Sequence, residues 1–87
     1  DPESTEGRAK PHYEKVIELA GQDLNRYKND LIEAYAYMGY YYYIQAETTK
    51  SKEDYQKSYE AYKKLKELDP QNPQAAQAIP YLESRIK

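Results

Sequence analysis

The sequence predicts an all-α fold of about four helices, and three observations support this prediction. Apolar residues recur at steps of three and four along most of the chain, which is the period of an amphipathic helix. Glycine and proline lie mainly between these stretches, with Gly39 the central exception. No stretch alternates as a half-buried strand does. Short connections between the predicted helices imply that neighbouring helices run antiparallel.

The first predicted helix has its apolar stripe at Ala9, Tyr13, Val16, Ile17 and Ala20. Proline lacks a backbone N–H and fits poorly inside a helix. The helix therefore begins near Lys10, or it begins near Glu3 and bends at Pro11. Gly21 is expected to end it, because glycine is the usual residue just past a helix C-terminus.

The second predicted helix is the longest, and its stripe is Leu24, Tyr27, Leu31, Tyr35, Met38, Tyr42 and Gln45. Asp23 or Asn25 is expected to cap its start, and residues 48–50 are expected to end it. The four consecutive tyrosines at 40–43 have the propensity of a strand. We nevertheless predict a helix there, because the helical spacing continues for several turns before them.

The third predicted helix opens at a capping pattern, in which Ser51 is followed three residues later by Asp54. Pro70 ends this helix, because the residue before a proline disfavours helix. Pro73 occupies the first position of a short fourth helix, which Pro80 is expected to kink or break. The inner face of the third helix is predicted to be Tyr55, Ser58, Tyr62, Leu65 and Leu68.

Composition excludes several classes of function for this chain of 87 residues, which we take as a single domain, 1–87. Without cysteine there is no disulfide framework and no thiolate metal site. The net charge is −2 with interspersed signs, so no basic face for nucleic acid is expected. No apolar stretch is long enough to predict a membrane span. His12 is the single histidine, so we expect no catalytic set, metal site or cofactor. The sequence does not indicate a compartment.

An internal repeat links the first and third predicted helices. Residues 13–21 align with residues 62–70 when the chain is shifted by 49 positions. Aromatic, aliphatic and helix-ending positions coincide. Self-similarity at this scale is typical of stacked helical hairpins.

Two motifs give this repeat a family resemblance. Residues 35–42 read aromatic-x-x-aliphatic-Gly-x-x-Tyr, and residues 58–62 read small-x-x-x-aromatic, followed by Pro70. The chain therefore resembles the tetratricopeptide repeat (TPR) family. Gly39 and Ser58 are small enough for two helices to approach closely, with tyrosine rings filling the space beside them.

The resemblance implies a right-handed α-solenoid of stacked antiparallel hairpins, with about one and a half repeats plus a terminal helix. The chain is interpreted as a fragment of a longer array. It departs from the family in its lengthened repeats, since Gly39 and Pro70 lie 31 residues apart against about 24 in a repeat of about 34 residues. Pro80 also falls where the family has glycine.

The resemblance further implies that the first helix of each hairpin lines a concave groove that binds a protein or peptide. The residues predicted to line it are Glu33, Ala36, Tyr37, Tyr40, Tyr43, Ile44, Gln74, Gln77 and Tyr81. The alternative is that these tyrosines pack against the first and last helices. Ala36 and Tyr40 occupy places where some family members hold a Lys and Asn clamp for acidic chaperone tails, so that function is not carried over.

The sequence thus predicts a protein-interaction module rather than an enzyme. The alternative is a structural segment whose aromatic face mediates self-association, as a homodimer or as part of a scaffold.

Overall fold

The computed structural model describes residues 10–87, which form helices and no strand. The helices are α2 (Lys10–Ala20), α3 (Leu24–Thr49), α4 (Lys52–Leu68) and α5 (Pro73–Ile86). The predicted all-α fold of about four helices is confirmed for this part of the chain. Ala9, and the alternative helix start near Glu3, lie outside the described residues, as do the first nine residues of the predicted domain.

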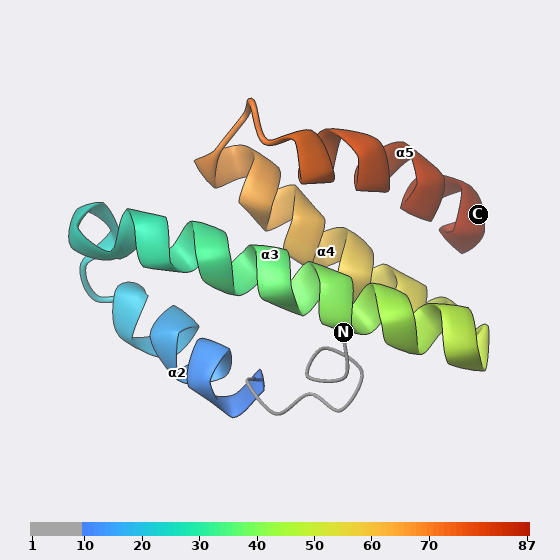
Figure 1. Cartoon of the computed structure of the whole chain (residues 1–87), viewed down its shortest axis with the longest axis horizontal. Coiled ribbons are helices and arrows are strands. Elements are labelled where there is room, and N and C mark those ends of the chain that lie inside the picture. The colour runs from blue at the N-terminus through green and yellow to red at the C-terminus, as the bar shows by residue number, and fades with distance from the viewer. Residues whose placement is uncertain (1–9) are drawn as a thin grey trace.

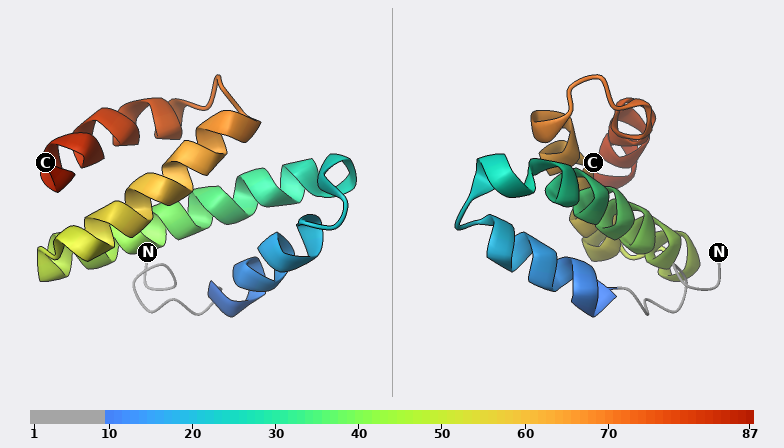
Figure 2. Two further views of the ribbon diagram at one scale, coloured as in Figure 1. Left: turned by 180° about the vertical axis from the view of Figure 1, so that it is seen from behind. Right: turned by 60° about the vertical axis from the view of Figure 1, so that its left-hand side comes forward.

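Each helix packs against the helix that follows it in the sequence. The chain reverses direction at every connection, so that neighbouring helices run antiparallel, as predicted (Figure 1). The long helix α3 pairs with α4, and α2 and α5 lie on opposite sides of this pair (Figure 2). This arrangement leaves α3 with one flank toward α2 and another toward α5.

The predicted helix starts are present in the structure. Asp23 caps α3 by accepting a hydrogen bond from the Arg26 backbone N–H, and Ser51 caps α4 in the same way through Asp54. Asn72 caps α5, directly before a proline at the first position. Each cap satisfies one of the N–H groups that a helix start leaves unpaired, which is why the sequence located these starts correctly.

The run of tyrosines at 40–43 is helical, as predicted, and lies within α3. The fourth helix is not broken at Pro80, because α5 continues through it to Ile86. Ala76 and Pro80 are both exposed. Pro80 has no N–H to donate to the Ala76 carbonyl. Because both residues are on the solvent side of α5, water can replace this missing hydrogen bond.

Helices α3 and α4 approach each other closely at Gly39 and Ser58, as the sequence predicts. The Ser58 hydroxyl is fully buried and donates a hydrogen bond of 2.7 Å to the Gly39 carbonyl oxygen. A Cβ atom at position 39 would lie only 2.8 Å from Cε2 of Tyr62. Glycine is therefore required here for the Tyr62 ring to lie against the α3 backbone.

The buried core continues from this contact toward α5. Leu65 of α4 and Leu82 of α5 are completely buried. The cluster around them also contains Ala46, Tyr55, Tyr62 and Ala75. Because this core joins α5 to the α3–α4 pair, it fixes the position of the α5 residues discussed below. Within residues 10–87, no helix combines the length and the apolar character needed to cross a membrane.

Candidate functional site

A hollow of about 320 Å³ lies between α3 and α5. Helix α3 contributes two tyrosines three residues apart, and α5 contributes residues from three successive turns on one face. The lining residues are Tyr40, Tyr43, Tyr62, Gln74, Gln77, Ala78 and Tyr81. Among the described residues, the hollow is thus lined by rings, amides and one methyl group, without a charged side chain.

Three of the four tyrosines of the hollow form two ring pairs. The ring centroids of Tyr40 and Tyr43 are 6.3 Å apart, with the planes tilted by 30°. Tyr43 and Tyr81 meet edge to face, with centroids 6.0 Å apart and planes at 72°. Such pairs are favourable aromatic geometries. They also present ring faces in different directions within one small space.

Tyr62 of α4 forms a buried part of the same lining. Its side chain is only 5% exposed, and it occupies the space that Gly39 leaves open on α3. Burial raises the pKa of its hydroxyl to about 12, with Tyr40 and Tyr43 adding to the shift. The close contact between α3 and α4 therefore also determines where the base of the hollow lies.

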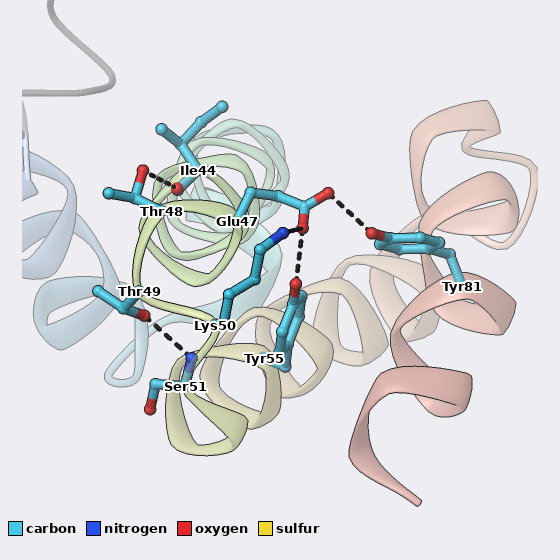
Figure 3. A network of polar contacts seen from close by, with 8 residues as sticks. All are labelled: Ile44, Glu47, Thr48, Thr49, Lys50, Ser51, Tyr55 and Tyr81. Atoms are coloured by element: carbon cyan, nitrogen blue, oxygen red, sulfur yellow. Dashed lines mark hydrogen bonds and ion pairs between the residues drawn. The ribbon is translucent and has the colours of Figure 1, made fainter.

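A carboxylate network lies next to the hollow, at the C-terminal end of α3. Glu47 accepts a hydrogen bond of 2.6 Å from the Tyr55 hydroxyl and one of 2.7 Å from the Tyr81 hydroxyl. The Lys50 ammonium lies 3.5 Å from the same carboxylate. Glu47 of α3 thereby connects a tyrosine of α4 with a tyrosine of α5 (Figure 3).

The network shifts the pKa of its members in the directions expected for a bonded carboxylate. The pKa of Glu47 is lowered to about 2, chiefly by the hydrogen bond from Tyr55 and then by that from Tyr81. The pKa of Tyr55 rises to about 12, mainly because its proton is held by Glu47. Burial, followed by the charge of Glu47, also raises the pKa of Tyr43. Glu47 is therefore ionised at neutral pH, beside the tyrosines of the hollow.

Five of the nine residues predicted as a contact surface line this hollow: Tyr40, Tyr43, Gln74, Gln77 and Tyr81. The structure thus brings together residues that are up to 41 positions apart in the sequence. Tyr40 is 40% exposed, so the hollow is accessible from solvent. The prediction that these residues bind a partner remains a prediction.

Two predicted residues lie on the opposite flank of α3, against α2. The rings of Tyr37 and Tyr13 are stacked at a tilt of 30°, with centroids 4.6 Å apart. The Tyr13 hydroxyl donates a hydrogen bond of 2.9 Å to Glu33. Tyr37 therefore packs against α2, as in the alternative interpretation. Glu33 is not among the residues that line the hollow.

Ala36 and Ile44 also do not line the hollow. Ala36 is partly buried and packs against the core cluster. Ile44 is half-buried, and its side chain lies on the side of α3 away from Tyr81 (Figure 3). Ala36 lies one turn before Tyr40 on the same face of α3, so its position along the helix, and not the helical period, separates it from the hollow.

Sequence reasoning missed three contributors to the site. Tyr62 was predicted as a core residue and is also part of the lining, and Ala78 was not considered. Glu47 was missed although a signal was present: it continues the Tyr40 and Tyr43 stripe by one turn, at the i+4 position from Tyr43.

Within the part of the chain that the structure describes, no three histidine or carboxylate side chains are gathered in a way that would hold a metal ion. No protein-family model, curated protein or solved structure shows a significant match to the chain.

Proposed function

We propose that this chain is a protein-interaction module that binds an extended segment of a partner protein in the hollow between α3 and α5. The observation that carries the proposal is the convergence of Tyr40, Tyr43 and Tyr81 with two glutamines in one accessible hollow.

The side chains of the hollow suit recognition of a peptide. Tyrosine supplies a large contact area and loses little conformational entropy on binding, because it has only two side-chain torsions. Aromatic residues are also over-represented among binding hot spots. Gln74 and Gln77 are exposed, and each amide offers both donors and acceptors. They are therefore suited to pair with the backbone of an extended peptide.

The proposal includes a TPR-like solenoid arrangement of the helices. Three features support it: antiparallel neighbours joined by short turns, the close contact of Gly39 with Ser58, and the resemblance between residues 13–21 and 62–70. In such an arrangement α3 and α5 are the first helices of successive hairpins. The hollow then lies on the face that the TPR family uses for its ligands.

The experiment is selection of random 12-residue peptides displayed on phage against the folded chain. Selected peptides are then titrated against Tyr40→Ala and Tyr43→Ala variants. Loss of a hot-spot side chain is expected to weaken binding about 30-fold, which corresponds to about 2 kcal/mol. Circular dichroism checks that helicity is retained.

Tyr27→Ala is the matched control, because Tyr27 lies near the start of α3 and is not among the residues of the hollow. Its titrations should resemble those of the wild-type chain. Peptides that bind the wild type and both hollow variants with equal affinity would remove the proposed function.

A second candidate function is self-association, which is favoured by leucine side chains exposed at the surface. Leu19 and Leu24, at the turn between α2 and α3, are 44% and 53% exposed. Leu24 also lines a second hollow together with Ile17 and Leu31. Light scattering over a hundredfold concentration range tests this candidate, and a monomer throughout would exclude it.

A further inference from the structure

The chemistry of the hollow between α3 and α5 indicates which side chain it accepts. We propose that the hollow binds the guanidinium group of an arginine in the partner peptide, an inference that rests on the proposed function and specifies its ligand.

Ring faces are concentrated in this hollow. Four of the seven lining residues are tyrosines. The face of an aromatic ring carries a negative potential, and a cation within about 6 Å of the ring centre is attracted to it. Because Tyr43 is tilted by 30° from Tyr40 and by 72° from Tyr81, a cation in the hollow meets rings from more than one direction.

Tyrosine rings elsewhere in this chain already lie against cations. Lys10 lies over Tyr41 and Tyr42, and Lys63 lies over Tyr59, each within 5.6 Å of a ring centre. Within residues 10–87, no lysine or arginine lies over Tyr40, Tyr43 or Tyr62. Because Tyr62 is buried, the rings of Tyr40 and Tyr43 are the ones left for a cation that another molecule supplies.

The charges around the hollow also favour a cationic side chain over an anionic one. An anionic side chain would face the negative ring faces and would find no cation in the lining. A cation, by contrast, is near the ionised Glu47, whose carboxylate accepts a hydrogen bond from the Tyr81 hydroxyl. A phenol that donates to a carboxylate gains electron density in its ring, and this strengthens the attraction of that ring for a cation.

Lys50 and Arg85 carry positive charge beside this network, and each already has a partner within the chain. Lys50 lies 3.5 Å from Glu47, and its side chain is 74% exposed. The guanidinium of Arg85 lies 4.8 Å from the centre of the Tyr81 ring. Arg85 does not line the hollow. Its stacking on Tyr81 is an example within this chain of the contact that we propose for the partner's arginine.

Arginine fits the hollow better than lysine for two reasons. A guanidinium is planar and weakly hydrated, so it stacks on aromatic rings at a lower desolvation cost than an ammonium. It also carries five N–H donors, for which the amide oxygens of Gln74 and Gln77 and the tyrosine hydroxyls are acceptors. An ammonium has three donors on one compact, strongly hydrated centre.

The test uses capped tripeptides Ala-X-Ala, in which X is arginine, citrulline, lysine or leucine. Citrulline keeps the shape of arginine and lacks its charge. The ring resonances of Tyr40 and Tyr43 are followed by NMR during each titration. We expect the arginine peptide to move both sets of resonances to saturation. The citrulline peptide should bind roughly fivefold more weakly, the ratio that about 1 kcal/mol of cation–π attraction produces.

Two variants of Tyr40 separate ring chemistry from shape, and the exposure of this residue makes both compatible with folding. Tyr40→Phe keeps a ring face and should retain most of the preference for arginine over citrulline. Tyr40→Leu keeps an apolar side chain without a ring face and should bring that ratio closer to one.

The outcomes distinguish this inference from the proposed function. Equal binding of arginine and citrulline peptides, or stronger binding of the lysine or leucine peptide, would overturn the inference and leave a peptide-binding hollow. Selected phage peptides that depend on Tyr40 and Tyr43 but lack arginine would have the same consequence. If no tripeptide moves these resonances and no selected peptide depends on them, both proposals fail.

Discussion

Replacing Gly39 with alanine tests the contact on which the arrangement of the helices depends. The added Cβ would lie 2.8 Å from Cε2 of Tyr62 and 2.9 Å from both Cδ2 and Cζ. Carbon atoms are in optimal contact at about 3.5–4.0 Å. The new methyl group therefore overlaps with the ring at three atoms, and the ring is only 5% exposed and has little room to move.

The expected change in stability combines two opposing effects. Overpacking of a core costs about 1–3 kcal/mol, whereas exchanging glycine for alanine within a helix contributes about 1 kcal/mol in the other direction. Three contacts below 3 Å with a nearly buried ring place the cost in the upper part of its range, at about 2–3 kcal/mol, so we expect a net loss of about 1–2 kcal/mol in the free energy of unfolding. In a domain of this size, that loss lowers Tm by roughly 4–15 °C.

The assay is thermal and urea unfolding followed by circular dichroism. Gly21→Ala is the matched control, because a Cβ there would be 3.4 Å from its nearest neighbour, the Glu18 carbonyl oxygen, which is ordinary contact. In a Tyr62→Leu background, Gly39→Ala should cost at least about 1 kcal/mol less than in the wild type, the coupling expected of residues in contact. An unchanged or raised stability of Gly39→Ala, or equal losses in both backgrounds, would refute the reasoning.

Three further predictions concern single side chains. Ser58→Ala should lower the free energy of unfolding by about 0.5–1.5 kcal/mol, measured by urea unfolding, because it removes the buried hydrogen bond to the Gly39 carbonyl; no loss would show that this bond contributes nothing to stability. Pro80→Ala should raise Tm, because alanine restores a backbone N–H inside α5 at an exposed position. Proline in a helix interior costs up to about 3 kcal/mol of stability, and this cost is removed. A lower Tm would contradict this. The pKa of Glu47 is lowered to about 2, so its contribution to stability is present above pH 4.5 and is lost as pH falls toward 2. In thermal unfolding, Glu47→Gln should therefore lose less stability than the wild type between pH 5 and pH 2.5. The control, Glu53→Gln, changes a residue in an exposed ion pair and should follow the wild type. Identical pH dependence of Tm for all three chains would contradict the assignment.

Local chemistry in the sequence was sufficient to predict the helices. The caps at Asp23 and Ser51 and the proline at position 73 each act within one turn of the chain. Their effect therefore does not depend on how the helices pack. The effect of Pro80 was harder to predict, because it depends on whether the carbonyl one turn earlier faces solvent or the core.

The site was predicted only in part, for a geometric reason. Helical spacing identifies which residues lie off the packing stripe of α3, but it does not tell which neighbouring helix covers each flank. Tyr37 and Tyr40 are both off that stripe, yet Tyr37 packs against α2 and Tyr40 lines the hollow beside α5. Glu47 was missed because its partners, Tyr55 and Tyr81, lie on other helices.

We propose above all that the rings between α3 and α5 bind a peptide from another protein. A crystal structure of the chain with its tightest phage-selected peptide tests this most directly. We predict peptide density in contact with Tyr40, Tyr43 and Tyr81, with an arginine side chain over one of these rings. Density over the α2–α4 side of the molecule, with those three tyrosines uncovered, would contradict the account.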